Sequence, residues 1–272
     1  MDPARAIEYL RRVIASPGYP PELCFFHCLH AVARWRVYRS DLDFLISSTD
    51  EETSMLRLGP GGATFPFDLV APFFCHGFGG TTFRDWVIGE VPSLFKSDQI
   101  TRHWLLAWLA VYFSPFDIVF RLMVRRQSPL RVIALMYEAI DSATTVSASV
   151  EKGLARFPDS SAAPVLLGLI GGVGGSVWRW IERRGRYEDV RTELAAPTRT
   201  FRQCLIYVLA HLWIRVRAGA RQARFAVAAF HTAWTLVEDA YGVPFDWTRP
   251  MARYMAVAVR ATLLLVSAVP SC

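Results

Sequence analysis

One run of residues limits the fold of this chain more than any other feature. From Ser160 to Trp178, 19 successive residues carry no charged side chain, and a helix needs about 20 apolar residues to cross the hydrocarbon core of a membrane. Shorter uncharged runs, which alone are equally typical of buried helices in soluble proteins, recur at 69–83, 103–116, 203–214, 225–237 and 261–272. Several such runs in one chain, with arginine at their ends, favour a membrane protein over a soluble all-helical one.

The composition supports this choice. Hydrophobic residues make up 53% of the chain and charged residues 20%, with a mean hydropathy of +0.24, which excludes a disordered protein. Of the 30 basic residues only Lys96 and Lys152 are lysine, and the arginines are scattered between apolar runs. This distribution is typical of loops between membrane spans and argues against a nucleic-acid-binding surface.

The apolar runs predict an all-α membrane protein with seven transmembrane helices. The pattern is continuous rather than alternating, and lipid leaves the backbone few other ways to satisfy its hydrogen bonds. We expect an N-terminal amphipathic segment at 1–21, a seven-helix domain at 22–247 and an apolar C-terminal segment at 248–272, in which 251–268 is either an eighth span or an interfacial helix. The expected spans are 22–38, 66–89, 100–123, 129–150, 162–182, 200–216 and 222–241.

An internal repeat predicts how these helices are arranged. Gly77-Phe78-Gly79-Gly80-Thr81-Thr82-Phe83-Arg84 matches Gly172-Val173-Gly174-Gly175-Ser176-Val177-Trp178-Arg179 at a constant offset of 95 residues. Each copy lies in the second span of a group of three, so the two copies are expected to cross the membrane in opposite directions. The sequence therefore predicts two inverted three-helix repeats followed by a seventh helix.

The glycines of the repeat have two possible roles. Small residues let helices approach closely, whereas three glycines in four residues also weaken a helix, and a broken membrane helix needs a protein or water environment for its freed backbone groups. Two clusters at a fixed offset favour breaks that line a polar passage. The predicted wall and helix breaks comprise Gly77, Gly79, Gly80, Thr81, Gly171, Gly172, Gly174, Gly175 and Ser176.

Several segments together resemble one known family, the trimeric intracellular cation (TRIC) channels. The similar segments keep the order and spacing of that family over most of the chain. They are 69–90 with its Cys75-His76-Gly77-Phe78-Gly79 motif, 108–120 with Ser114-Pro115-Phe116-Asp117, the glycine-rich 168–186, Pro197-Thr198-Arg199 and Val243-Pro244-Phe245-Asp246.

The resemblance implies a function. Members of this family are homotrimers with one pore in each subunit, lined here by glycine-broken helices 2 and 5, and they conduct K⁺ and other monovalent cations as counter-ion flux for Ca²⁺ release. It also implies an intracellular membrane such as the endoplasmic reticulum, with the N-terminus luminal and the C-terminus cytoplasmic, which agrees with the excess of basic residues in loops on one side. No enzyme activity, cofactor or metal is expected.

The fourth span departs from the family pattern. Tyr137 stands where the family has a lysine and Asp141 where it has an arginine, so phosphoinositide binding at this site is doubtful. Glu138 and Asp141 share one face of the helix and either attract cations or pair with arginines of the glycine-rich helices. The gating candidates are Arg84, Arg179, Tyr137, Glu138 and Asp141, and the candidates for contact with anionic lipid are Arg125, Arg126 and Arg131.

Other motifs carry less information. Cys24, His27, Cys28 and His30 lack the two separated ligand pairs typical of zinc sites, so we interpret them as packing residues and interfacial histidines. Pro-Phe-Asp occurs three times and is typical of helix starts. Hydrolase, zinc-protease and phosphate-loop motifs are absent from the sequence, and no catalytic residue is predicted. An alternating-access carrier and a membrane-embedded lipid-modifying enzyme remain the alternative functions.

Overall fold

Every secondary-structure element in the described part of the chain is a helix. The computed structural model describes residues 21–47, 67–126, 128–186, 198–242 and 246–248. The predicted all-α class is confirmed, whereas the pairing of two inverted repeats stays a prediction. The predicted segments 1–21 and 248–272 fall almost entirely outside the described residues.

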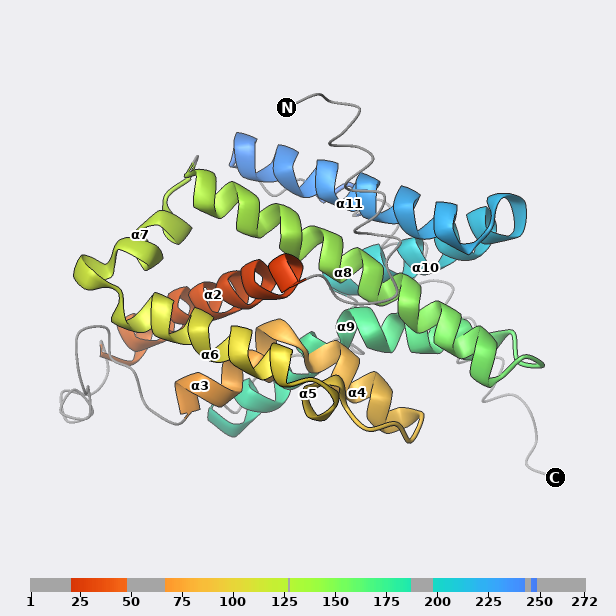
Figure 1. Cartoon of the computed structure of the whole chain (residues 1–272), viewed down its shortest axis with the longest axis horizontal. Coiled ribbons are helices and arrows are strands. Elements are labelled where there is room, and N and C mark those ends of the chain that lie inside the picture. Colours follow the sequence, from red (N-terminus) through yellow and green to blue (C-terminus); the bar gives the residue numbers. More distant parts are fainter. Residues whose placement is uncertain (1–20, 48–66, 127, 187–197, 243–245, 249–272) are drawn as a thin grey trace.

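The expected spans correspond closely to observed helices, with α8 crossing the middle of the molecule against α2, α9, α10 and α11 (Figure 1). The elements are α2 (Pro21–Ser47), α3 (Phe67–Pro72), the π-helix η2 (Phe73–Gly77), α4 (Gly79–Val87), α5 (Ser93–Lys96), α6 (Asp98–Phe113), the 3₁₀ helix η3 (Pro115–Asp117), α7 (Ile118–Val124), α8 (Pro129–Arg156), α9 (Ala162–Arg186), α10 (Arg199–Ala218) and α11 (Ala220–Tyr241).

The apolar core is divided between the two halves of the chain. One cluster joins α2 to α6, with Val32 and Val111 fully buried, and a second joins α8 to α9, α10 and α11, with Val150 and Val208 fully buried. A smaller cluster around Trp35 connects α2 to η2 and α9. Burial of this kind contributes about 25 cal/mol for each Å² of apolar surface removed from water, so each half has its own stabilising core.

The second predicted span is broken, as expected from its glycines. It consists of α3, the π-helix η2 and α4, which meet at Phe78, whose φ of −101° and ψ of 13° are not helical. Pro72 precedes the π-helix, and a proline inside a helix removes one backbone donor and clashes with the preceding turn. At the break, the Phe78 N–H donates to the carbonyl of Phe73 at 2.6 Å.

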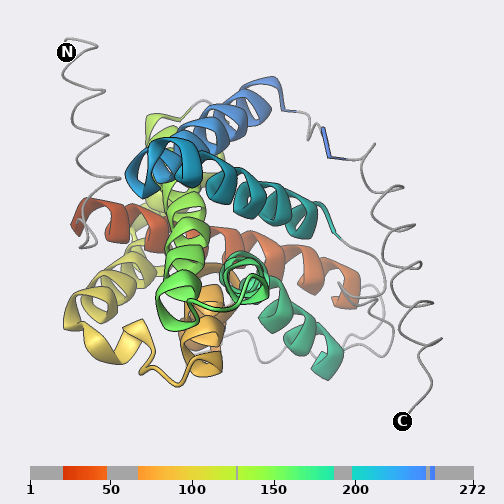
Figure 2. The same ribbon diagram turned by 90° about the vertical axis from the view of Figure 1, so that its right-hand side faces the viewer.

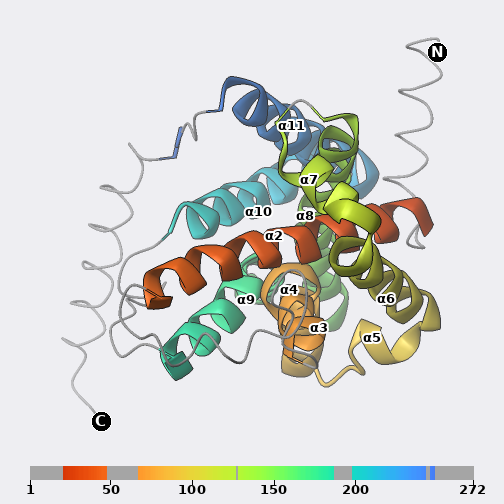
Figure 3. The same cartoon turned by 90° about the vertical axis from the view of Figure 1, so that its left-hand side faces the viewer.

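The third predicted span is also broken, at Ser114–Asp117. Phe116 and Asp117 have φ values of 54° and 60°, in the left-handed region that side chains rarely adopt, and α6 and α7 meet at 90°. Arg36 of α2 holds this corner, because its guanidinium donates to both carboxylate oxygens of Asp117 at 2.9 and 2.7 Å and to the carbonyl of Val111 at 2.7 Å. Figure 3 shows α6 and α7 beside one end of α2.

The aspartates of the Pro-Phe-Asp motifs join distant segments of the chain. Like Asp117, the aspartates of the other two motifs accept hydrogen bonds from distant side chains: Asp68 from the Trp35 Nε1 at 2.8 Å, and Asp246 from Arg202. Each aspartate therefore fixes the start or end of one segment against another helix, a role that the local capping pattern does not predict.

Few described helices could cross a membrane by their own length and composition. Ala162–Glu182 of α9 is long and apolar enough, and α6 with α7 passes the same test if the bent pair forms one span. Both are spans that the sequence predicts.

Candidate functional site

The two glycine copies contact each other where α4 crosses α9. A methyl group on Gly80 would lie 2.0 Å from the carbonyl oxygen of Gly171, and one on Gly174 would lie 2.7 Å from the Cα of Gly80. These distances are far below van der Waals contact, and a backbone atom cannot rotate away as the end of a side chain can. The repeat in the sequence therefore corresponds to a direct contact in space.

Neighbouring glycines bring α9 close to two further helices. A methyl group on Gly171 would lie 2.2 Å from the Ser149 Oγ of α8, and one on Gly172 would lie 2.4 Å from the Cys204 Sγ of α10. A methyl group on Gly79 would lie 1.9 Å from a backbone oxygen of η2. Close packing, the first of the two roles considered for these glycines, is thus a real function of this cluster.

The predicted break at the second glycine copy is wrong. α9 is helical without interruption from Ala162 to Arg186, although it changes direction, since Figure 2 views its first part end-on and its later part from the side. Each glycine lowers helix stability by about 1 kcal/mol relative to alanine, but the glycine-rich stretch contains no proline and is supported by α4, α8 and α10. This packing maintains the helix and leaves only a bend.

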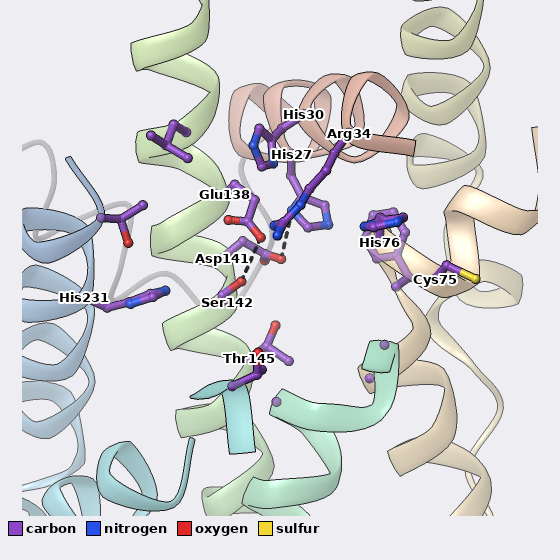
Figure 4. Close-up of a pocket in the computed structure, with 18 of the residues that line it drawn as sticks. His27, His30, Arg34, Cys75, His76, Glu138, Asp141, Ser142, Thr145 and His231 are labelled. Carbon is purple, nitrogen blue, oxygen red and sulfur yellow. Dashed lines mark hydrogen bonds and ion pairs between the residues drawn. The ribbon is translucent and has the colours of Figure 1, made fainter. Parts of the chain in front are cut away.

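A cavity of about 960 Å³ lies beside the crossing and is lined from both halves of the chain. Its polar wall combines side chains of α2, η2, α8 and α11 (Figure 4). Of the predicted wall residues, the cavity is lined by Gly77, Gly80, Thr81, Gly171, Gly172 and Gly175. The other three, Gly79, Gly174 and Ser176, are not part of this lining as far as the structure describes it.

The two acidic residues of α8 face the cavity. Asp141 is only 6% exposed, and one of its oxygens lies 3.4 Å from the Nδ1 of His27 on α2. Ser142 donates a hydrogen bond to Glu138 at 3.2 Å, and Arg34 extends from α2 toward both acids (Figure 4). Of the alternatives left by the sequence, pairing with the glycine-helix arginines is not seen among the described contacts of Arg84 and Arg179, and cation attraction stays a prediction.

Arg84 has a different partner from the one considered. Its guanidinium donates to Asp85 at 2.9 and 2.6 Å and to the Ser149 Oγ at 3.0 Å. Lys152 of α8 also donates to Asp85 at 3.1 Å, and Asp85 is fully buried. This network joins α4 to α8 on the far side of the glycine crossing from Glu138.

The remaining gating candidates contact the broken span and α2. Arg179 donates to the carbonyl of Cys75 in η2 at 2.7 Å and to the Ser176 Oγ at 2.7 Å, so the arginine of the second glycine copy supplies a donor to the break in the first. The ring of Tyr137 stacks on Phe26 of α2 with centroids 5.2 Å apart. Tyr137 thus makes an apolar contact with α2.

The three lipid-binding candidates differ in their surroundings. Arg131 donates to Asp239 of α11 at 3.0 and 2.7 Å and to the carbonyls of Met123 and Val124, which compensates its charge inside the protein. Arg125 and Arg126 are exposed, and Arg126 donates to the carbonyl of Gly242 at 3.4 Å. Arg125 is therefore the candidate best placed to meet a lipid headgroup.

Sequence reasoning missed the histidines as site residues. His27, His30, His76 and His231 all line the cavity, whereas the first two were interpreted as interfacial. The available signal was their spacing, because residues three and four apart on a helix share one face, and His27, His30 and Arg34 repeat at that interval. Among the described residues no group of three or more His, Cys, Asp or Glu side chains could hold a metal ion.

Comparisons with known proteins agree on one family. The family model described as "TRIC channel" matches residues 66–230. The trimeric intracellular cation channel type 1B.2 of Caenorhabditis elegans is 26% identical over 156 residues, which cover 55% of this chain and 49% of that relative, so the match spans about half of the relative's length.

Solved structures have the same fold. A trimeric intracellular cation channel from C. elegans matches with a TM-score of 0.61 in the absence of Ca²⁺, at 21% identity over 86% of this chain and 96% of that one. With bound Ca²⁺ the TM-score is 0.63, at 17% identity over 88% and 98%. A structure described as a TRIC counter-ion channel in calcium release gives 0.64, at 14% identity over 88% and 99%.

The family model covers more than half of the chain, and its matched region runs from the broken second span to α11. The glycine crossing and most of the cavity wall lie within this region. The chain therefore belongs to the TRIC channel family, a family of membrane ion channels and not of enzymes.

Proposed function

We propose that this protein conducts monovalent cations, K⁺ foremost, across an intracellular membrane such as the endoplasmic reticulum, and that the flux balances charge during Ca²⁺ release. The proposed unit is a homotrimer with one pore in each subunit. The channel domain is 22–247, flanked by the segments 1–21 and 248–272, with the N-terminus luminal and the C-terminus cytoplasmic. The relatives whose descriptions name trimeric cation channels and counter-ion activity support this proposal.

The observation that carries the proposal is the polar cavity beside the glycine crossing. Two carboxylates of α8, Glu138 and Asp141, face a space of about 960 Å³ that is lined by six basic and four acidic side chains, and carboxylates on such a wall attract cations to their own part of it. Charged side chains inside membrane segments are costly and usually serve a function. The pore is proposed to pass along this cavity, with Gly77, Gly80 and Thr81 on one wall and Gly171, Gly172 and Gly175 on the other.

Gly79, Gly174 and Ser176 are proposed to support the cavity wall without lining it. The two glycines allow the close contacts of α4 and α9, and the Ser176 hydroxyl accepts a hydrogen bond from Arg179. Arg84, Arg179 and Tyr137 are proposed to influence gating through the contacts between halves. Arg125, and to a lesser extent Arg126, is proposed to contact anionic lipid, whereas Arg131 is held by Asp239.

A substitution that fills the cavity tests the proposal. Thr145 of α8 lines the cavity, whereas Ile133 of the same helix is 39% exposed and does not belong to the lining. We expect Thr145→Phe to reduce K⁺ flux into liposomes at least about tenfold, because even one well-placed large side chain blocks a hydrated ion, while Ile133→Phe leaves flux at the wild-type level. Equal flux in both variants would exclude the cavity as the conduit.

The same liposomes separate a channel from a carrier. A channel gives unitary current steps in a planar bilayer and flux that follows the K⁺ gradient, whereas alternating access gives saturating, coupled uptake. Saturating uptake without unitary steps would replace the channel proposal by the carrier alternative.

A further inference from the structure

We propose that His27 and Asp141 together set the charge of the cavity wall where α2 meets α8, so that cation flux falls when His27 takes up a proton. This inference rests on the proposed function, because it treats the cavity as the ion path. It goes beyond that function in assigning proton control to a pair of residues, one on α2 and one on α8.

The pair is buried and depends on itself for polar contact. His27 is 2% exposed and Asp141 6% exposed, and the His27 Nδ1 lies 3.4 Å from an Asp141 oxygen. Neither nitrogen of His27 has a hydrogen-bond partner among the described residues, and the second oxygen of Asp141 lacks one as well. Because burying a polar group without a partner is costly, the charge state of one residue strongly affects the other.

The pair also lies at the break in the second span. The His27 ring packs edge-on against Phe78, with centroids 5.1 Å apart, and Phe78 is the non-helical residue between η2 and α4. Gly77 and Phe78 line the same cavity. A change in the contact between His27 and Asp141 therefore occurs where the cavity wall is least helical.

Two charge states follow from this geometry. With His27 neutral, Asp141 has no cationic side chain within ion-pair distance among the described residues, and its carboxylate attracts cations. With His27 protonated, an imidazolium lies at ion-pair distance from that carboxylate and cancels most of its field. Acid adds the proton to His27, so a low pH should lower cation flux through this cavity.

Other charged and titratable groups face the same space and bear on the proposal. His231 differs from His27 in being bonded to the Tyr207 hydroxyl at 2.9 Å, and the His76 ring lies against Trp35 and Tyr38. The groups that line the cavity around the pair are His30 and Arg34 on α2, Cys75 and His76 on η2, Lys96 on α5, Arg126 after α7, Glu138 and Arg131 on α8, Arg179 on α9, Arg199, Cys204 and Tyr207 on α10, and His231, Glu238 and Asp239 on α11.

Proton dependence of K⁺ flux in liposomes tests the inference. As the pH falls from about 8 to about 5.5 we expect wild-type flux to fall about threefold or more, because protonation of His27 places a positive charge beside the Asp141 carboxylate. His27→Gln, which cannot be charged, should keep high flux at both pH values. His27→Lys, which carries a permanent positive charge at this position, should give low flux at both.

Matched variants separate His27 from its neighbours. Asp141→Asn should give low flux with little pH dependence, and it keeps the inference testable if His27→Lys does not fold. His103→Gln, outside the cavity lining in the described structure, should retain the wild-type pH profile. Loss of the pH response in His231→Gln but not in His27→Gln would overturn the inference.

The outcomes also separate this inference from the proposed function. Wild-type flux that falls with pH equally in His27→Gln and Asp141→Asn would overturn the role of the pair and leave the channel proposal intact. Absence of wild-type flux at both pH values would overturn the channel proposal and the inference together.

Discussion

The first and second halves of the chain use similar sequences to build different helices. In the first half the spans at 66–89 and 100–123 are both broken, at Phe78 and at Ser114–Asp117. In the second half the spans at 162–182 and 200–216 form continuous helices, α9 and α10. Since both glycine copies contain three glycines in four residues, glycine content does not by itself determine where a membrane helix breaks.

The difference lies in what accompanies the glycines. The first half has Pro72 before its π-helix and two left-handed residues at the second break. α2 anchors both broken spans, because Trp35 bonds Asp68 at the start of α3 and Arg36 bonds Asp117 at the second break. The second glycine copy has no proline, and its glycines meet the surfaces of α4, α8 and α10. A break thus requires a local cause and a tertiary anchor, whereas glycine alone permits a bend.

The largest effect is expected at the glycine crossing. Gly80→Ala and Gly174→Ala each place a methyl group against backbone, at 2.0 and 2.7 Å, and should destabilise the protein by about 3 kcal/mol or more. Gly175→Ala is the control from the same cluster, because its nearest neighbour would lie at 3.4 Å, and alanine favours the helix by about 1 kcal/mol. Thermal unfolding in detergent measures all three.

A different order of stabilities would break the comparison. If Gly175→Ala lowered the unfolding temperature as much as Gly80→Ala, the cluster would serve helix flexibility and not the crossing of α4 with α9.

The second effect concerns the corner between α6 and α7. Asp117→Ala removes the carboxylate that binds Arg36. Arg36 is only 6% exposed, so the substitution leaves a buried guanidinium with fewer partners. Breaking such a pair costs about 3 kcal/mol when the remaining charge is buried, and we expect about 2 kcal/mol because the Asp117 side chain is 33% exposed. Asp159→Ala, an exposed loop residue, is the control in the same unfolding assay.

The third effect separates the arginines before α8. Arg131→Ala removes the contact with Asp239 at 2.7 Å and should lower stability by about 1 to 2 kcal/mol, without weakening the binding of anionic vesicles. Arg125→Ala should do the reverse and reduce vesicle binding by up to about 1 kcal/mol, the usual contribution of one basic residue near a charged membrane. Vesicle co-flotation measures lipid binding, and thermal unfolding measures stability. Weaker vesicle binding in Arg131→Ala with no loss in Arg125→Ala would contradict this assignment.

The smallest effect is at the ion pairs that join α4 and α5 to α8. Hydrogen bonds from Lys152 and then Lys96 lower the pKa of Glu90 to about 2. A carboxylate with a lowered pKa stabilises the folded state above its ordinary pKa, and the contribution is lost as the pH falls toward about 2. The effect of Glu90→Gln should therefore be constant from neutral pH to about pH 5 and remain below about 1 kcal/mol, since the pair is exposed.

Chemical unfolding of wild type and Glu90→Gln at several pH values checks this. A difference between them that grows or vanishes between about pH 5 and pH 8 would mean that another group, such as a cavity histidine, controls this contact.

Much of the helical framework could be predicted from the sequence. Uncharged runs predicted α9, the α6–α7 pair and α10. The constant offset between Gly77 and Gly172 identified two related segments, and these segments contact each other in the structure. These features follow from local composition and repeat spacing, which a single sequence displays directly.

The rest depends on contacts between distant residues. The continuity of α9 follows from its packing against Ser149 and Cys204, and the partner of Arg84 is its own neighbour Asp85, so neither was apparent from the glycine pattern. His27 belongs to the site because its turn of α2 lies directly beside Asp141 of α8. Helical spacing suggested a shared face for His27 and His30, but only the fold determines what that face meets.

One measurement tests most directly whether the cavity between the halves carries the ions. Thr145→Cys places a thiol on the cavity wall and Ile133→Cys places one on the exposed face of the same helix. Both are made in a protein that carries Cys75→Ser and Cys204→Ser, because these two native cysteines also line the cavity, and that protein alone is the control. A cationic thiol reagent should lower single-channel K⁺ current in Thr145→Cys and leave the other two proteins unchanged. Unaltered current in Thr145→Cys, after mass spectrometry has verified modification of that thiol, would contradict the account.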